Sequence, residues 1–224
     1  MEASVVAFNT IRAALSPEIT LVVVTKTHPI ETIWPVYKAG ARIFGENRVQ
    51  ELLQKKEQLP DDIQWHLIGQ LQRNKVRAIL PHAALIHSVS SESLFREIQK
   101  EAQKMSLQPH VLLQVHVAQE DTKSGFLPED LFSFLNKWAG QTAPVQIQGL
   151  MGMATFTEDQ QQVASEFRQL KSIFEQVKAD YGIHFPHFTT LSMGMSGDWP
   201  LAVNCGSNMI RVGSSIFGHR PAQS

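Results

Sequence analysis

The sequence predicts an α/β fold, a single (β/α)8 barrel of the TIM type with an extra helix at its N-terminus. Eight short apolar stretches with the character of β-strands alternate with helical patterns along the 224 residues. Strict alternation indicates a parallel sheet, and a chain of this length lies at the small end of the size range of the barrel. No linker or shift in composition divides the chain, so we predict one domain over residues 1–224. A doubly wound open sheet is the main alternative.

Each predicted strand is a short run rich in apolar and β-branched residues, bounded by turn residues. In chain order, the strands are expected at residues 20–25, 41–44, 63–69, 85–89, 110–117, 145–151, 188–193 and 209–213. The helices between them are recognised by their longer periodic patterns. They are expected at residues 5–15, 30–39, 47–58, 74–80, 92–105, 128–139, 160–178 and 199–204.

Several helices carry start or stop signals. Ser91 and Asp159 stand where a side chain can cap a helix N-terminus, and Pro128 suits a first helical position. Gly40 is a typical helix stop. Pro35 lies inside the helical pattern at 30–39, where we expect it to kink the helix or end its first turn.

Composition restricts the class of protein. The formal net charge is -1, which gives no electrostatic footprint for nucleic acid. Cys205 is the single cysteine, so no internal disulfide is possible and a reducing compartment is indicated. No stretch approaches the roughly 20 apolar residues that span a membrane, and the N-terminus lacks the pattern of a signal peptide. We therefore expect a cytoplasmic protein, a monomer, with no nucleic-acid or membrane partner.

Lys26 stands at the end of the first predicted strand, directly after an apolar run. A solitary ammonium is costly to remove from water, so a lysine at the end of a buried strand is unusual. Burial lowers the pKa of a lysine, and the resulting free amine is a nucleophile toward carbonyl groups. The alternative is an ordinary strand-end lysine whose ammonium reaches solvent.

Polar residues follow other strands too, at the end of a barrel where active sites lie. They include Asn47, His66, Ser88, His116, Ser192 and Arg211. The turn at Gly213-Ser214 presents backbone N–H groups and hydroxyls after the last strand, and Ser192 closes the seventh. Such turns bind phosphate in barrels, although each one alone is also consistent with a helix cap that holds no ligand.

Lys26 and a phosphate site on strands seven and eight would be neighbours in a closed barrel. Pyridoxal 5′-phosphate (PLP) has the carbonyl and the phosphate that such a site requires, with Lys26 as its Schiff-base partner. Arg211 would then face the pyridine nitrogen and keep it unprotonated. An aldolase-type Schiff base with a sugar phosphate needs much the same residues, and composition does not separate the two.

The sequence also resembles the YggS/PROSC family of pyridoxal phosphate homeostasis proteins. The motifs that carry the resemblance are collinear and cover residues 22–218: Val24-Thr25-Lys26-Thr27-His28-Pro29, Phe44-Gly45-Glu46-Asn47, Trp65-His66-Leu67-Ile68-Gly69, Gly149-Leu150-Met151-Gly152-Met153, Leu191-Ser192-Met193-Gly194-Met195-Ser196-Gly197-Asp198 and Ile210-Arg211-Val212-Gly213-Ser214-Ser215-Ile216-Phe217-Gly218. His28 and Arg48 depart from the lysine and tyrosine that are common in the family at these positions.

The resemblance implies a barrel like the N-terminal domain of alanine racemase, the PLP fold of type III, without its second β-domain. It implies PLP on Lys26, a phosphate held by Ser192 and Gly213-Ser214, and Arg211 near the ring nitrogen. Asn47 is expected either to contact the cofactor or, together with Glu46, to cap its helix. The implied role is intracellular vitamin B6 and amino-acid or keto-acid homeostasis, without robust catalysis and with no residue assigned as catalytic.

A low-activity PLP-dependent amino-acid racemase is the alternative function. Racemisation needs a base on each face of the planar intermediate, and the second base of alanine racemases is a tyrosine. Tyr37 and Tyr181 are the only tyrosines, and both are patterned on outer helices. The histidines show no metal-ligand spacing, so we predict no metal site.

Overall fold

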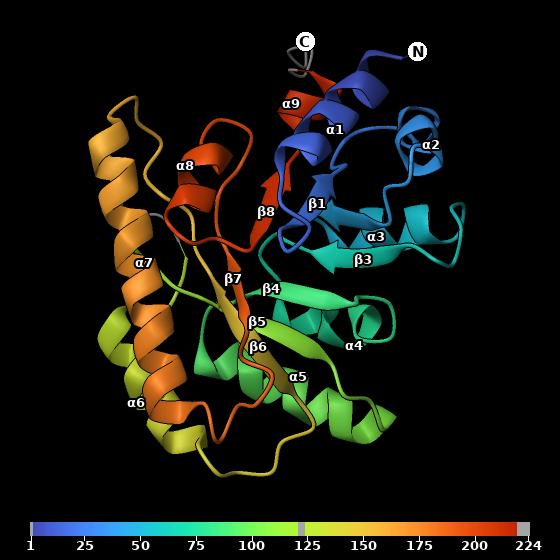
Figure 1. Cartoon of the computed structure of the whole chain (residues 1–224). Coiled ribbons are helices and arrows are strands. Elements are labelled where there is room, and N and C mark those ends of the chain that lie inside the picture. The colour runs from blue at the N-terminus through green and yellow to red at the C-terminus, as the bar shows by residue number, and fades with distance from the viewer. Residues whose placement is uncertain (1, 121–123, 219–224) are drawn as a thin grey trace.

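Eight parallel strands close into a barrel in the computed structural model, which describes residues 2–120 and 124–218. Each strand pairs with the next in chain order, and β8 pairs in parallel with β1. Figure 1 shows the helices packed around the outside of this sheet. The predicted (β/α)8 barrel is confirmed, and the open doubly wound sheet is wrong, because β1 and β8 are hydrogen-bonded neighbours rather than separate edges.

The strands are short and lie close to their expected positions. They are β1 (Thr20–Val24), β2 (Ile43–Glu46), β3 (Gln64–Leu67), β4 (Leu85–Val89), β5 (His110–Gln114), β6 (Gln146–Met151), β7 (Thr190–Ser192) and β8 (Met209–Val212). The α-helices are α1 (Ala3–Ala14), α2 (Ile30–Lys38), α3 (Val49–Lys56), α4 (Val76–Ile79), α5 (Glu92–Met105), α6 (Pro128–Trp138), α7 (Gln160–Tyr181), α8 (Trp199–Asn204) and α9 (Ser214–Phe217). A 3-10 turn, η1 (Arg73–Lys75), precedes α4.

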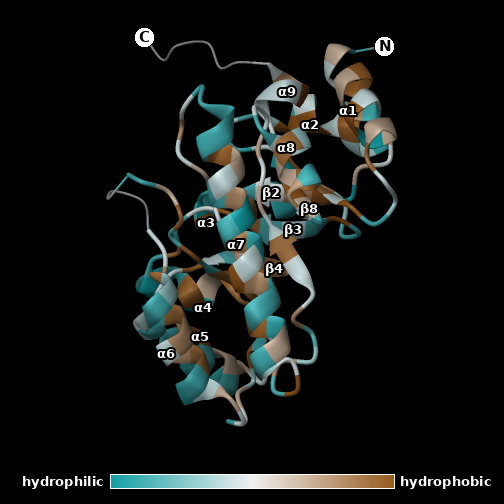
Figure 2. Cartoon of the chain, turned by 60° about the vertical axis from the view of Figure 1, so that its left-hand side comes forward, coloured by the Kyte–Doolittle hydropathy of each residue, from teal (hydrophilic) through white to brown (hydrophobic). Residues whose placement is uncertain are grey.

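Alternation along each strand separates two apolar cores. The larger core lies between the strands and the helices, which are hydrophobic on one side only (Figure 2). A smaller cluster fills the interior of the barrel and consists of Val22, Leu85, Leu112, Met151 and Met209. Residues of one parity therefore point into the barrel, and their neighbours along the strand pack under the helices.

The capping signals read from the sequence are confirmed at two helices. The Ser91 hydroxyl accepts from the backbone N–H of Leu94 at 3.3 Å, and Asp159 Oδ1 accepts from the N–H groups of Gln161 and Gln162. Pro35 lies inside α2, which nevertheless runs without a break from Ile30 to Lys38.

Two differences from the expected elements affect the site. Strand β2 extends to Glu46, where the sequence suggested a turn, because residues 43–46 pair with residues 64–67 of β3. The expected basic helix at 74–80 is divided into η1 and α4.

The extra helix α1 packs beside α9 at the end of the chain (Figure 1). Phe8 and Ile11 of α1 are buried in the larger apolar core, so α1 is anchored to the barrel as well as to α9. Among the helices that the structure describes, none is long and apolar enough to cross a membrane.

The closest backbone approach in the barrel wall predicts a strong effect of one substitution. Gly149 in β6 has φ +152°, and a Cβ built there would lie 1.7 Å from the carbonyl oxygen of Thr190 in β7. Gly149→Ala should therefore lower the free energy of unfolding by about 2–3 kcal/mol, measured by urea denaturation. Gly197→Ala is the control, since nothing lies within 4 Å of its Cβ position and little change is expected. Equal stability of the two variants would contradict this reading of the β6–β7 contact.

Candidate functional site

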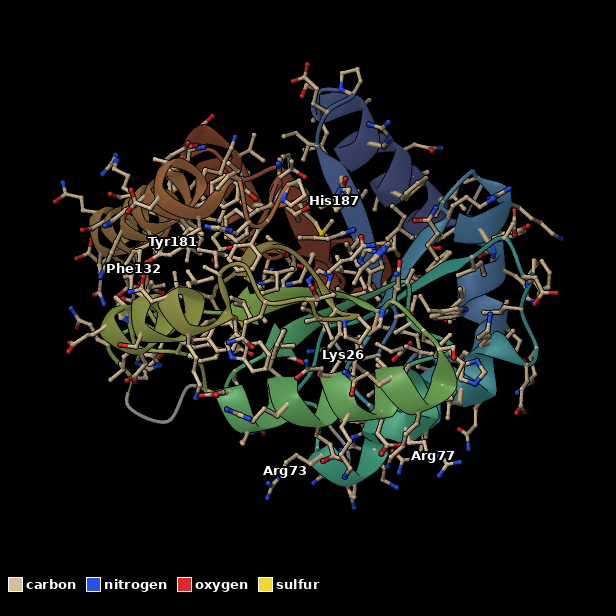
Figure 3. All side chains as sticks on the ribbon, turned by 90° about the horizontal axis from the view of Figure 1, so that it is seen from below. Lys26, Arg73, Arg77, Phe132, Tyr181 and His187 are labelled. Atoms are coloured by element: carbon tan, nitrogen blue, oxygen red, sulfur yellow. The ribbon has the colours of Figure 1, made fainter. Side chains whose placement is uncertain are left out.

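Lys26 lies two residues after the end of β1. Counting alternate residues from Val22, which faces the barrel interior, puts Lys26 on the same inward side. The N–H of Thr25 donates to the Gly45 carbonyl at 3.0 Å, so backbone bonding with β2 continues to the residue before the lysine. Lys26 is half-buried, and Figure 3 places it near the middle of the barrel rather than at the margin where Arg73 and Arg77 lie. A lysine in this position stands at the carboxyl end of the strands, where barrels carry their chemistry.

The Gly213 turn lies directly beside the end of β1. A Cβ on Gly213 would be 3.0 Å from the carbonyl oxygen of Val24, two residues before Lys26. The Ser196 hydroxyl accepts from the N–H groups of Gly213 and Ser215, at 3.1 and 3.3 Å. These N–H groups open α9, so the structure brings an anion-compatible set of donors next to the lysine.

Two aromatic rings connect the lysine loop to α9. The imidazole of His28 packs on the ring of Phe217, with centroids 4.6 Å apart and planes tilted by 32°. The His28 ring thus contacts α9 from the loop that carries Lys26.

Arg211 lies on β8 beside Val22 of β1, and its side chain is buried inside the barrel. Its Nη1 donates to the carbonyl and the hydroxyl of Ser192, at 3.0 and 2.6 Å, and its Nη2 donates to the Gly152 carbonyl at 3.1 Å. Burial lowers the pKa of Arg211 to about 10, which leaves the guanidinium charged at neutral pH. These three bonds use three of the five guanidinium N–H groups, and two remain for other contacts.

A chain of hydrogen bonds continues from Arg211 across the barrel interior. Ser192 Oγ lies 3.2 Å from His87 Nδ1, and His87 Nε2 lies 3.0 Å from His66 Nδ1. The Ser192 hydroxyl accepts from Arg211 and shares a hydrogen bond with His87, whose tautomer sets the direction of the bonds to Ser192 and His66. Since the Ser192 hydroxyl is occupied in this chain and fully buried, a contact between Ser192 and phosphate stays a prediction.

His66 and His87, the two histidines of this hydrogen-bond network, are neutral near pH 7. Burial lowers the pKa of His66 to about 3, and burial together with His66 and Arg211 lowers the pKa of His87 well below its ordinary value. The sequence suggested that His66 borders the site, but it did not pair it with His87. The sequence feature that could have predicted this pair is that each histidine stands at a similar place along its strand, His66 on β3 and His87 on the adjacent β4.

A second polar network lies on the helix side of β1 and was not predicted. The ammonium of Lys55, on α3, lies 2.6 Å from Glu46 Oε1 and 2.7 Å from Glu51 Oε1. It also donates to the Thr25 carbonyl at 2.7 Å, while the Thr25 hydroxyl donates to Glu46 Oε1 at 2.6 Å. Burial raises the pKa of Glu46, and Lys55 and Thr25 oppose that rise.

The backbone directly after Lys26 is in an unusual conformation. Thr27 has φ +68°, in the left-handed region that β-branched residues rarely adopt. Such a conformation costs about 1–3 kcal/mol and persists only where the surroundings impose it. Here the Thr27 N–H donates to Glu51 Oε1 at 2.5 Å, which supplies one of the contacts that hold it.

Asn47 follows β2 and continues the inward parity of Gly45. Its Oδ1 is buried and has no hydrogen-bond partner among residues 2–120 and 124–218. The expectation that Glu46 and Asn47 cap the next helix is wrong: α3 begins at Val49 with Arg48 as its N-cap, and no side chain caps it. Glu46 instead points to the helix layer because it belongs to β2, and Asn47 points the other way.

Both tyrosines lie away from this site. The Tyr37 hydroxyl donates to Asp62 at 2.9 Å, and the Tyr181 hydroxyl donates to Asn136 at 2.8 Å. Figure 3 shows Tyr181 beside Phe132 at the margin of the molecule, far from Lys26. The described part of the chain also holds no group of three or more His, Cys, Asp or Glu side chains able to bind a metal ion.

The closed barrel with a lysine after β1 and an arginine on β8 defines a barrel of the alanine racemase N-terminal class. The family model described as alanine racemase, N-terminal domain, matches residues 7–221. A pyridoxal phosphate homeostasis protein of Aquifex aeolicus is 40% identical over 197 residues, which cover 88% of this chain and 85% of the relative. One of Schizosaccharomyces pombe is 36% identical over 215 residues, covering 95% and 89%. The chain belongs to the family of pyridoxal phosphate homeostasis proteins, as its motifs predicted.

Solved structures agree with this assignment. PipY of Synechococcus elongatus without PLP has a TM-score of 0.90 and 36% identity, covering 97% of this chain and all of PipY. The PipY structure with PLP bound has a TM-score of 0.87 and 36% identity, covering 96% of this chain. An alanine racemase of Clostridium difficile has a TM-score of 0.78 at 15% identity, and this chain covers 57% of it. That likeness shows a shared barrel fold.

The neutral histidines predict a loss of stability in mild acid. An unfolded imidazole takes up a proton near pH 6.5, whereas folded His66 does so only near pH 3, so the unfolded state binds more protons between these values. The free energy of unfolding should therefore fall as the pH drops, by about 2 kcal/mol per buried histidine between pH 7 and pH 5. In His66→Gln the fall should be smaller by about that amount. Urea denaturation at the two pH values measures this, with the exposed His184→Gln as the control. An unchanged pH dependence in His66→Gln would show that His66 is not a neutral buried base.

Proposed function

We propose that this chain binds PLP at the mouth of the barrel, as a Schiff base on Lys26. The observation that carries the proposal is the contact between the Gly213 turn and the strand that presents Lys26. The strand that leads to Lys26 and the backbone N–H groups of the Gly213 turn are neighbours, which supports a site for an amine and a phosphate of the kind that a phosphorylated aldehyde requires. The PipY structure with PLP bound, 36% identical over 96% of this chain, supports the same ligand. A sugar phosphate is the alternative left open at the level of composition.

The residues at the mouth suit the other groups of PLP. The cofactor supplies an electrophilic aldehyde and an electron-accepting pyridine ring. In our proposal, Gly213 and Ser214 hold the phosphate through N–H groups and a hydroxyl, and Arg211 faces the ring nitrogen with its remaining N–H groups. Asn47 contributes an amide whose buried oxygen lacks a partner in the described residues. A ligand that pairs with this oxygen would remove an unfavourable buried acceptor.

Ser192 takes part through Arg211. Its hydroxyl and carbonyl both accept from the guanidinium, and His87 holds the hydroxyl from the other side. In this role, Ser192 orients the arginine, whose permanent charge disfavours a proton on the pyridine nitrogen. An unprotonated ring is a weaker electron sink, which suits a protein that holds the cofactor more than one that uses it.

We further propose a role in intracellular PLP, amino-acid and keto-acid homeostasis without robust catalysis. The relatives are named as homeostasis proteins, and neither tyrosine of this chain lies where a second base would stand. A low-activity amino-acid racemase is the alternative, favoured by the barrel shared with alanine racemases. The free thiol of Cys205 suits a reducing, cytoplasmic location, and we propose that the chain acts as a monomer.

Replacement of Lys26 tests the binding proposal. Purified protein mixed with PLP should develop a visible absorbance band that borohydride abolishes, because the lysine amine and the aldehyde form a C=N bond with loss of water. Lys26→Ala should form no such band, whereas the surface variant Lys100→Ala should behave as the unmodified protein. A band of full intensity in Lys26→Ala would place the cofactor on another residue.

A turnover assay separates storage of the cofactor from catalysis. The PLP-loaded protein is incubated with a panel of single-enantiomer amino acids, and the opposite enantiomer and the keto acid are measured over time. We expect at most a trace of either product, since Tyr37 and Tyr181 are bonded to Asp62 and Asn136 and lie away from Lys26, where a second base would be needed. Sustained turnover that disappears in Lys26→Ala would establish the racemase or a related enzyme instead.

A further inference from the structure

The peptide groups on both sides of Lys26 are tied to one buried network. Before the lysine, the Thr25 carbonyl accepts from Lys55 Nζ at 2.7 Å, and the Thr25 hydroxyl is bonded to Glu46. After it, the Thr27 N–H donates to Glu51, whose same oxygen lies 2.7 Å from Lys55 Nζ. A single ammonium therefore joins both anchors of the lysine backbone.

The network is largely buried and contacts the backbone of the loop that carries Lys26. The Lys55 side chain is only 7% exposed, and that of Glu46 is fully buried. A buried ion pair adds little to stability compared with well-packed apolar residues, because desolvating both charges is costly. In contrast, the network closes around the one described β-branched residue with a left-handed backbone, Thr27. Strain of this kind is maintained where a particular geometry is needed.

The strain determines where the Lys26 side chain leaves the backbone. Val22 and Lys26 have the same parity, so an extended strand would direct the lysine inward, but the chain has to turn toward α2 immediately afterwards. The chain turns over residues 25–28, where the His28 N–H donates to the Thr25 carbonyl at 3.0 Å and Thr27 has the positive φ. If the anchors at Thr25 and Thr27 were released, the turn could relax and the lysine amine would no longer have a defined position over the barrel.

We propose that Lys55 is a positioning residue for Lys26. Together with Glu46 and Glu51 it clamps the backbone on both sides of the lysine, so that the amine is aimed at the cofactor before the cofactor arrives. The proposal rests on the proposed binding of PLP by Lys26, and it adds a second lysine that acts through the backbone without touching the ligand. Preorganisation of this type raises the rate of bond formation because the reacting group needs no further ordering.

The experiment uses the full chain and two measurements. The first is the rate at which the visible band appears after mixing with PLP, together with the fraction of Lys26 that borohydride traps at saturating PLP. The second is amide hydrogen exchange of the segment 25–28 without PLP. In Lys55→Met, we expect the band to appear at least about tenfold more slowly and the exchange of this segment to rise by about tenfold or more.

A matched set of variants separates positioning from folding. Lys55→Met with Glu46→Gln removes both buried charges and should give a folded protein, by circular dichroism, with the same slow attachment of PLP. Glu51→Ala removes only the anchor on Thr27, at a side chain that is 21% exposed, and should slow attachment by a smaller factor. Lys55→Arg keeps a cation at the centre of the clamp and should restore part of the rate. Lys56→Met, the neighbouring lysine of α3, is the control and should match the unmodified protein.

The outcomes distinguish the clamp from the proposed function. The positioning role is overturned if the double variant is folded and both of its rates, amide hydrogen exchange of the segment 25–28 and attachment of PLP, are within about twofold of those of the unmodified protein. If amide exchange of the segment 25–28 is faster in the double variant, but neither the unmodified protein nor any variant forms a Lys26-dependent band with PLP, the clamp exists and the PLP function is rejected. Faster exchange together with slow attachment supports both.

Discussion

The pairing of β1 with β8 is the interaction on which the site depends. It closes the barrel and aligns Val22 with Arg211, residues from opposite ends of the chain. The same seam brings the Gly213 turn against the strand that leads to Lys26. Neither half of the chain can form this site alone, because the amine comes from the first strand and the anion donors follow the last. Closing a loop between residues so far apart in sequence is entropically costly, and the packing of α1 on α9 adds a further contact between the two ends of the chain.

Strand alternation divides the polar residues near the mouth into two groups with different tasks. On the inner side, Arg211 is linked through Ser192 to two neutral histidines. On the outer side, Thr25 and Glu46 turn toward α3 and meet Lys55. A one-residue shift in either strand would exchange the two groups. The register of the barrel is therefore what keeps the binding chemistry inside and its support outside.

Much of this arrangement could be predicted from the sequence. The strand count, Lys26 at a strand end and the Gly213 turn follow from patterns that are local in the chain. What could not be predicted depends on neighbours that are distant in sequence. The partner of His66 is on the next strand, and Lys55 looks like an ordinary helix lysine until β2 is known to extend to Glu46. Sequence periodicity indicates which side of an element is buried, but it does not show which buried polar groups meet.

The Ser196 hydroxyl gives the anion donors a substitute partner within the chain. It accepts from the N–H groups of Gly213 and Ser215, so neither is left without an acceptor when no anion is near. Any phosphate that uses these groups has to compete with this hydroxyl, and the hydroxyl can return as the phosphate departs. Internal competition of this kind weakens retention of a ligand but lowers the barrier to its exchange.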